Sequence, residues 1–286
     1  MPELPDIELY LAKLRDRIVD QRLTSFRVTG LSVLKSVTPA PKDLAGRRVL
    51  GLRRIGKRIV LELEGDSFIV IHLMIAGRLR WVEAGGKPLG GKIVSAVLEF
   101  DNGSLFLTEA GSKKRASITL VQGEEELKAH NPGGIEVLDS TLDAFTKALK
   151  AANQTVKNRL TDPHVFSGIG NAYSDEILFA ARLSPLRLTH KLADDETARL
   201  YSASRTVLKE WTERLQKQFE NKFPGAGDVT AFRPDFAVHG KFGKPCPVCG
   251  NPVKRIRYSD NEANYCATCQ NDGKALADRA LSRLLK

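Results

Sequence analysis

Two Cys-x-x-Cys pairs near the carboxyl end constrain the fold of this chain more than any other feature. Cys246-Pro247-Val248-Cys249 is separated by sixteen residues from Cys266-Ala267-Thr268-Cys269, and the 286-residue chain has no other cysteine. Two such knuckles at this spacing form a tetrahedral Zn²⁺ site with four thiolates. Four protein ligands leave no open coordination position, so the zinc is structural, and so small a unit needs the metal to fold. The sequence therefore predicts a zinc β-hairpin that holds one Zn²⁺ through Cys246, Cys249, Cys266 and Cys269.

The carboxyl end is also basic. The formal net charge of the chain is +10, and residues 241–286 contribute nine Lys/Arg against four Asp/Glu. Between the knuckles, residues 254–258 alternate basic and apolar side chains, as expected of a hairpin strand that presents charge on one face. A basic protein with a concentrated basic end suits a polyanion, and nucleic acid is the simplest one.

The sequence excludes a membrane protein. No run approaches the roughly 18 uninterrupted apolar residues of a membrane span, whereas a hydrophobic content of 42% is sufficient for packed cores. The amino terminus carries acids at Glu3, Asp6 and Glu8 and lacks the basic-then-apolar pattern of a signal peptide. We therefore expect a cytoplasmic protein without a membrane partner.

An amphipathic helix followed by a β-rich region makes up the first part of the chain. Apolar residues spaced by 4, 3 and 4 positions predict a helix over residues 5–19 with one core-facing side: Ile7, Leu11, Leu14 and Ile18. Residues 22–122 show short apolar or alternating runs, which predict a β-sandwich or barrel. Asn102-Gly103 predicts a two-residue hairpin turn. The expected strands are 49–52, 59–63, 68–73, 77–82, 94–100 and 105–108.

The second half of the chain is predominantly helical. Helical periodicity covers residues 142–151, 155–160, 171–181 and 194–219. Between the middle two segments, Gly168-Ile169-Gly170-Asn171 is a tight turn that runs into a helix N-terminus. Its glycines let backbone amides approach a ligand closely, and the helix start favours an anion. This is the geometry of a helix–two-turn–helix that grips a DNA phosphate at Gly170 and Asn171, although many helix hairpins with a glycine turn bind nothing.

The first eight residues, Met1-Pro2-Glu3-Leu4-Pro5-Asp6-Ile7-Glu8, are dense in reactive groups. A small residue at position two favours removal of Met1, which leaves Pro2 as a free secondary amine. An α-amino group titrates near about 7.7–8, so a useful fraction is neutral at physiological pH. Its addition to an aldehyde-level carbon gives an iminium, with Glu3 as the adjacent acid/base. Taken alone, the same residues are more typical of a helix start.

Two basic segments in the β-rich region are further candidates for contact with nucleic acid. Lys57 lies in a basic cluster over residues 53–58, at the head of a strand, where it either contacts phosphate or belongs to a solvated charge run. Lys113-Lys114-Arg115 forms a second basic loop after a strand. Residues 130–134, His-Asn-Pro-Gly-Gly, are typical of a linker and place a domain boundary near 125–140.

Taken in order, these signals resemble the formamidopyrimidine-DNA glycosylase/endonuclease VIII family of base-excision repair enzymes. The resemblance rests on Met-Pro-Glu-Leu-Pro at the start, the β-rich domain, Gly-Ile-Gly-Asn-Ala-Tyr in the helical domain and the four-cysteine hairpin. It implies an α+β protein that acts as a monomer in the bacterial cytoplasm and holds damaged double-stranded DNA with a flipped base between its domains. The expected parts are a β-sandwich catalytic domain with an N-terminal helix (1–125), a linker (126–138), a helix–two-turn–helix domain (139–222), a zinc finger (236–273) and a helical tail (274–286).

The resemblance assigns roles residue by residue. Pro2 resembles the nucleophile that attacks C1′ of the deoxyribose, expels the oxidised base and forms the iminium, and Glu3 resembles the acid/base that opens the sugar ring. Lys57 occupies the position of a lysine that contacts phosphate near the lesion and donates a proton for β-elimination. Asn171 matches the phosphate-binding asparagine of the helix–two-turn–helix. The expected reaction ends in β,δ-elimination and leaves a one-nucleoside gap.

The chain departs from the family pattern in its zinc hairpin and first helix. Asn261 stands where the family usually carries an arginine that touches the phosphates at the lesion. Because asparagine cannot supply a bidentate cation, Arg257 or Arg255 is the candidate substitute. Asp6 is shorter than the glutamate usual at its position.

Two loops also differ from the family. His72-Leu73-Met74-Ile75 stands in place of a His-Leu-Gly-Met-like run, so Met74 or Ile75 is expected to fill the gap left by the flipped base. Lys113 and Arg115 belong to a loop in which an arginine and a phenylalanine are usual, and no aromatic residue stands there. These departures fall on the parts that select the lesion and its opposite base.

We therefore expect a bifunctional DNA glycosylase and AP lyase that acts on oxidised bases and carries one structural zinc. Two alternatives stay open. One is a non-catalytic binder of damaged DNA that kept the fold, which Asn261 supports, and the other is an enzyme that acts on abasic sites only. The intact Pro2-Glu3 pair argues against loss of the chemistry.

Overall fold

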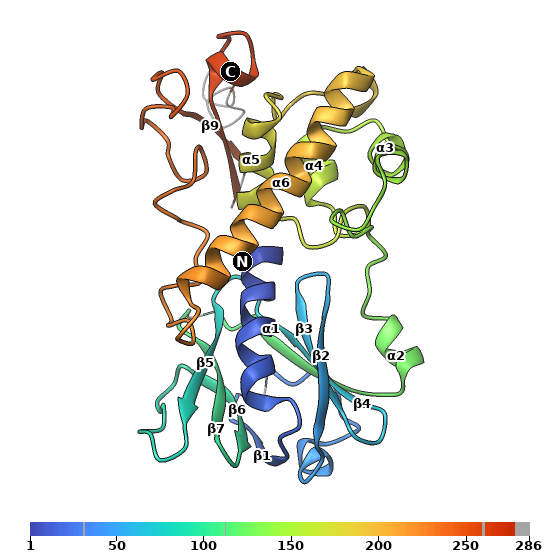
Figure 1. Ribbon diagram of the computed structural model, residues 1–286, viewed down its shortest axis with the longest axis vertical. Helices are drawn as coiled ribbons and strands as arrows, with labels where there is room; N and C mark the ends of the chain where they lie inside the picture. Colours follow the sequence, from blue (N-terminus) through green and yellow to red (C-terminus); the bar gives the residue numbers. More distant parts are fainter. Residues whose placement is uncertain (31, 112, 259–260, 278–286) are drawn as a thin grey trace. The chain divides into compact units, whose positions relative to one another are not determined.

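The computed structural model describes residues 1–30, 32–111, 113–258 and 261–277 (Figure 1). The chain divides into two compact units, one formed by residues 1–132 and 212–230 and the other by residues 133–211 and the chain from Ala231 onward. The first unit thus takes in residues 212–222, which the sequence places in the helical domain.

The first unit is a β-sandwich of two four-stranded antiparallel sheets, as predicted. One sheet has the order β1-β6-β7-β5, with β1 (Leu23–Val28), β5 (Gly77–Glu83), β6 (Val94–Phe100) and β7 (Gly103–Glu109). The other has the order β2-β3-β4-β8, with β2 (Val49–Ile55), β3 (Arg58–Leu63), β4 (Ser67–His72) and β8 (Ser117–Gln122). The predicted strands omitted β1 and β8. A register shift between Leu23 and Ser25 interrupts the alternation of β1, so periodicity does not reveal it.

The hairpin between β6 and β7 turns one residue earlier than predicted. Phe100 pairs with Gly103, so the two turn residues are Asp101 and Asn102. A Cβ on Gly103 would lie 2.4 Å from the Trp81 ring and 2.6 Å from the Val82 carbonyl oxygen, so the strand position requires glycine. Asn102 instead donates its side-chain Nδ2 to the Arg17 carbonyl oxygen at 2.7 Å, near the end of the first helix.

Helix α1 (Leu4–Ile18) is buried in the core of the first unit. The four residues predicted to face the core are at most 1% exposed. Its other side is also covered, because Tyr10 packs against the ring of Phe223 and Lys13 Nζ donates to the Glu220 carbonyl oxygen at 2.9 Å. Figure 1 shows α1 running along the sheets of this unit. The amino terminus therefore begins on a rigid element.

The second unit contains the helices and the zinc-binding hairpin. Its elements are α3 (Leu142–Lys150), α4 (Val156–Thr161), α5 (Asn171–Ala180), α6 (Asp194–Gln218), β9 (Lys254–Tyr258), β10 (Asn261–Tyr265) and α7 (Ala267–Gln270). Helix α6 belongs to this unit up to Trp211 and to the first unit from Thr212. Thr141 and Thr155 cap α3 and α4, because their hydroxyls accept hydrogen bonds from backbone N–H groups in the first turn. The remaining short helices are η1 (Pro41–Leu44), α2 (Glu124–Lys128) and η2 (Thr189–Lys191).

Residues 222–240, which follow α6, have no regular secondary structure, but several of their side chains are buried in the two units. Val229 is buried in the core of the first unit, and Phe236 and Val238 are buried in the second. After the last cysteine, residues 274–277 are not helical, and the rest of the predicted tail helix lies outside the described residues. Leu276 packs on Tyr265 of the hairpin and donates its N–H to the tyrosine hydroxyl at 2.7 Å. None of the helices in the described chain is both long and apolar enough to cross a membrane.

Candidate functional site

The amino-terminal residues are held by the first turn of α1. Met1 is 37% exposed, whereas Pro2 is buried and Glu3 is 3% exposed. Glu3 is the N-cap residue: its backbone N–H donates to Asp6 Oδ2 at 2.9 Å, and its carbonyl oxygen accepts from Ile7 N at 3.0 Å. The shortened acid at position 6 thus reaches the cap backbone and fixes the chain at Glu3.

The surroundings of the amino terminus favour an uncharged amine. Burial lowers the pKa of the Met1 amino group below its ordinary value of 8.0, and the charges of Arg78 and Lys57 lower it further, while Glu3 and Asp6 oppose the shift. The charges of two acidic and two basic side chains therefore act on the amino group of Met1. Sequence reasoning missed Arg78, because it lies in a strand of alternating basic and apolar residues, Gly77-Arg78-Leu79-Arg80, that is typical of a half-exposed sheet edge.

Lys57 lies close enough to Glu3 for the two charges to interact. It occupies the second position of the two-residue turn between β2 and β3, after Gly56 with φ +59°. Burial lowers the pKa of its ammonium group, and the nearby Glu3 carboxylate partly restores it. This half-buried setting is not that of a solvated surface lysine. The structure thus brings together Pro2, Glu3 and Lys57.

His72 is a second group that the sequence did not reveal. It ends β4, pairs with Arg58 on β3, and is half-buried. Burial lowers its pKa to about 4, and the charges of Arg58 and Lys57 act in the same direction. The imidazole is therefore neutral at physiological pH, next to two cations.

The loop between β4 and β5 carries both candidates for the gap-filling residue. Met74 adopts a left-handed conformation with φ +52°, and Ile75 is 58% exposed. The loop is closed by Arg78, whose Nη1 donates to the carbonyl oxygens of Ile75 at 3.0 Å and Gly77 at 2.7 Å. Of the two candidates, exposure favours Ile75.

The basic loop after β7 is anchored by a buried acid. Lys113 and Arg115 are exposed. Glu109 is 2% exposed, and its carboxylate accepts hydrogen bonds from Arg115 N at 2.9 Å and Ala116 N at 3.2 Å. This loop lies next to the β4–β5 loop, because a Cβ on Gly111 would lie 3.7 Å from Ala76 Cβ.

In the second unit, the glycine turn leads into α5 as the sequence predicts. Gly168 has φ +79°, and Gly170 is the N-cap of the helix that begins at Asn171. Asn171 is half-buried, and its Nδ2 donates to the Glu262 carbonyl oxygen of β10 at 2.9 Å. The turn and the zinc-binding hairpin are therefore in direct contact.

The four cysteines are a site for one structural Zn²⁺. Their sulfur atoms all lie within 4.8 Å of one another, with Cys246 Sγ 3.8 Å from Cys269 Sγ and Cys249 Sγ 3.4 Å from Cys266 Sγ. A Zn–S distance of about 2.3 Å in a tetrahedron corresponds to S···S distances of about 3.8 Å. The geometry of the donor set thus fits the metal that the sequence predicts.

Of the two arginines proposed to replace the missing cation of the hairpin, Arg257 is the better placed. Arg255 lies over the ring of Phe242 at 4.1 Å and pairs with Glu262 at 3.6 Å. Arg257 is exposed, on the strand that follows the first knuckle. The side chain of Asn261 lies outside the described part of the structure.

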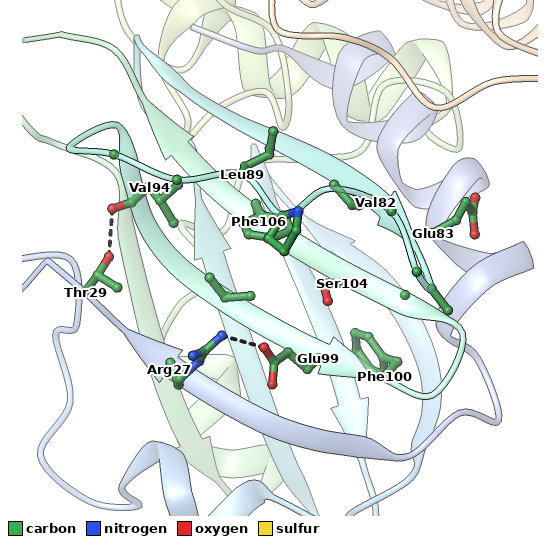
Figure 2. Close-up of a pocket in the computed structure, with 18 residues that line it drawn as sticks. Arg27, Thr29, Val82, Glu83, Leu89, Val94, Glu99, Phe100, Ser104 and Phe106 are labelled. Atoms are coloured by element: carbon green, nitrogen blue, oxygen red, sulfur yellow. Dashed lines mark hydrogen bonds and ion pairs between the residues drawn. The ribbon is translucent and has the colours of Figure 1, made fainter.

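A separate pocket of about 460 Å³ lies on the outer face of the β1-β6-β7-β5 sheet, under the glycine-rich loop of residues 84–91 (Figure 2). Val97 and Phe106 form its apolar floor, and the ion pair between Arg27 and Glu99 lies at its side. Its lining contains none of the catalytic, DNA-binding or metal-binding residues proposed from the sequence.

Comparison with known protein families gives three matches along the chain. The model of the formamidopyrimidine-DNA glycosylase N-terminal domain matches residues 1–111, that of the formamidopyrimidine-DNA glycosylase H2TH domain matches residues 134–221, and that of the zinc finger found in FPG and IleRS matches residues 243–271. The three matches follow the order of the sandwich, the helices and the hairpin.

Curated relatives and solved structures agree with these matches. A protein named formamidopyrimidine-DNA glycosylase from Heliobacterium modesticaldum is 33% identical, and the match covers 94% of this chain and all of the relative. The relative of the same name from Thermus thermophilus is 31% identical over 96% of this chain and all of its own length. The crystal structure of the Thermus thermophilus MutM (Fpg) protein matches with a TM-score of 0.78 at 28% identity, covering 96% of this chain and 100% of that one. Lactococcus lactis Fpg, bound to DNA with an AP site, matches with a TM-score of 0.80 at 23% identity, which shows a shared fold.

Proposed function

Because this chain belongs to the formamidopyrimidine-DNA glycosylase family, we propose that it excises oxidised bases from damaged double-stranded DNA and then cleaves the strand as an AP lyase. The observation that carries this proposal is the amino terminus. Buried Pro2 precedes Glu3, the N-cap residue of α1, and the charge of the Glu3 carboxylate acts on Lys57. A helix start alone requires neither a half-buried lysine nor an amine with a lowered pKa.

The reaction begins with the loss of Met1, which converts the Pro2 nitrogen from an amide into a secondary amine. The amine forms a bond to C1′ of the deoxyribose, the glycosidic C1′–N bond breaks, and the base leaves with a proton. The ring oxygen then takes a proton from Glu3, and the C1′–O4′ bond opens to give the iminium. The Met1 amine, whose pKa is lowered by burial and by the charges of Arg78 and Lys57, lies one residue from the Pro2 nitrogen, so the same surroundings favour the nucleophilic form of the Pro2 amine.

Strand cleavage follows from the iminium. It acidifies the 2′ hydrogen, so a base removes that proton and the 3′ phosphate leaves as the C3′–O bond breaks. A second elimination expels the 5′ phosphate, and water releases the sugar fragment from Pro2. Lys57 is proposed to give or take a proton in these steps, because burial brings its pKa towards the working range.

The second unit is proposed to bind the DNA backbone. The Gly170-Asn171 turn offers backbone amides at a helix start, and Arg257 offers an exposed cation beside it on the hairpin. The structural zinc keeps the hairpin folded. Lys113, Arg115 and Ile75 are proposed to act at the lesion, from loops of the first unit.

Borohydride trapping tests the chemistry. The purified protein, with removal of Met1 verified by mass spectrometry, is mixed with a duplex that bears an abasic site and is then reduced. We expect a covalent adduct for the wild type and for the control Pro5→Ala, and none for Pro2→Gly. Absence of an adduct with the wild type would contradict the lyase mechanism and leave damaged-DNA binding without catalysis, the alternative that Asn261 favours.

A panel of duplexes tests the glycosylase step. Duplexes carry 8-oxoguanine, formamidopyrimidine, thymine glycol or dihydrouracil, each opposite all four bases. Release of at least one base is expected. Adduct formation at an abasic site without release of any base would reduce the function to an abasic-site lyase.

A further inference from the structure

A buried polar network in the second unit joins α4 and α5 to the zinc-binding hairpin. At its centre, Asp175 on α5 is 1% exposed. Its Oδ1 accepts a hydrogen bond from Lys157 Nζ of α4 at 2.5 Å. Its Oδ2 accepts from His239 Nδ1 at 2.7 Å and from the backbone N–H of Asn264 on β10 at 3.0 Å. One carboxylate thus receives donors from three separate segments.

The two opposite charges at the centre of this network are paired, and every N–H group of the Lys157 ammonium has an acceptor. Lys157 is also buried, and its ammonium donates to Ser174 Oγ at 2.9 Å and to the Asn171 carbonyl oxygen at 3.2 Å, in addition to Asp175. Three acceptors match the three N–H groups of an ammonium. Buried ion pairs add little net stability compared with apolar packing, but their directional contacts tolerate few alternative arrangements. The network is therefore better suited to fixing a geometry than to stabilising the unit.

The neighbouring acid holds the segment that leads to the zinc site. The Glu176 carboxylate accepts backbone hydrogen bonds from Ala237 at 2.7 Å, Val238 at 2.9 Å and His239 at 2.8 Å. Burial raises the pKa of Glu176, and these three amides oppose the shift. Glu176 thus holds residues 237–239, which precede the hairpin in the chain. Within the described structure, Asp175 is the one of these two acids that contacts β10.

The position of β10 decides where Arg257 lies. Glu262 is opposite Arg257 in the β9–β10 register, so their side chains project from the same face of the hairpin. The carbonyl oxygen of Glu262 is the acceptor of Asn171 Nδ2. Asn264, which Asp175 binds, is two residues further along the same strand. Asp175 therefore holds the strand that places Arg257 beside the start of α5.

We propose that Asp175 is a positioning residue that locks the zinc-binding hairpin in register with the amino terminus of α5, so that Arg257 and the Asn171 turn bind the same stretch of DNA backbone. This inference rests on the proposed DNA-binding function. It also explains how the hairpin works with asparagine at position 261, because the cation comes from the opposite strand in a fixed place.

Asp175→Asn keeps the shape of the side chain and removes its charge. We expect about tenfold weaker binding of a duplex with a reduced abasic-site analogue, and a salt dependence of log Kd that is smaller by about one counterion. Zinc content and the single-turnover rate of adduct formation at saturating DNA should not change. The matched control is Asp195→Asn, which changes an exposed acid on α6. It should leave the affinity for the duplex and the salt dependence of log Kd at the wild-type level.

A double-mutant cycle with Arg257→Ala separates positioning from a general structural role. We expect Arg257→Ala to weaken binding about tenfold in the wild type and less than threefold in Asp175→Asn, because the arginine is already misplaced. An equal loss in both backgrounds, or no loss in the wild type, would overturn the proposal. If Asp175→Asn loses zinc, the cycle is run with His239→Gln, which keeps the Lys157–Asp175 pair. A wild type that neither binds the duplex nor forms the adduct would instead refute the proposed function.

Discussion

The hydrogen bond from Glu3 N to Asp6 Oδ2 connects the stability of α1 with the proposed chemistry, and Asp6→Ala tests that connection. The donor and acceptor are 2.9 Å apart, and Asp6 is 3% exposed. The substitution removes this acceptor from the cap of α1 and an acid from the first turn of the helix. It leaves the apolar face of the helix unchanged.

The expected cost follows from the environment of the bond. Loss of a helix cap costs about 1 kcal/mol, and a hydrogen bond to a charged group contributes about 1.5–3 kcal/mol. The two effects overlap, so we expect about 2 kcal/mol less free energy of unfolding for the first unit. Because about 1.4 kcal/mol corresponds to a factor of ten, looser positioning of Pro2 and Glu3 should slow adduct formation about tenfold. Asp6→Glu should recover most of both losses, because glutamate is the usual partner in a capping box.

Stability and rate can be measured on the same proteins. In a Trp211→Phe background, Trp81 on β5 is the single tryptophan and reports urea unfolding of the first unit. The rate is that of single-turnover borohydride trapping. Asp16→Ala, at an exposed position of α1, is the matched control. If Asp6→Ala and Asp16→Ala have the same urea midpoint and the same trapping rate, the reasoning is refuted. If Asp6→Ala has a lower urea midpoint but an unchanged trapping rate, the link between helix stability and the chemistry is refuted.

Three further predictions follow from other parts of the structure. Burial lowers the pKa of His72 to about 4, so the unfolded state binds a proton more readily than the folded state as pH falls from 6.5 to 4. Over this range the free energy of unfolding of the wild type should fall by on the order of 2 kcal/mol more than that of His72→Gln. Urea midpoints that fall equally in the two proteins would contradict this. Gly77→Ala places a Cβ 2.3 Å from the Leu73 carbonyl oxygen, so it should cost about 1–3 kcal/mol and weaken lesion binding, whereas Gly90→Ala, in open space, should change neither urea midpoint nor affinity. Chelation of zinc should unfold the hairpin and weaken DNA binding while Trp81 emission stays native, and unchanged affinity after measured zinc loss would contradict the role of the hairpin.

The structure also shows where the sequence pattern was incomplete. The spacing of Ile7, Leu11, Leu14 and Ile18 gave the correct buried face of α1, but it did not reveal that the opposite side packs on residues after α6. Asn102-Gly103 correctly predicted a hairpin between β6 and β7, but the turn residues are Asp101 and Asn102. Gly103 is needed in the strand because the Trp81 ring lies close to it, and this tertiary contact is not visible in the local sequence. Arg78, His72 and Glu109 carry no local signal, since each derives its importance from neighbours that are distant in the chain.

The sequence by itself determined those features that depend on local spacing. Knuckle spacing predicted the zinc ligands, periodicity predicted helices α1, α3, α4, α5 and α6, and the glycine turn predicted the start of α5. Only the tertiary structure decided which groups share a site. The pKa of Lys57 depends on burial and on Glu3, and the register of the hairpin depends on Asp175, 89 residues before Asn264. Burial and charge act through space, and spacing along the chain does not encode them.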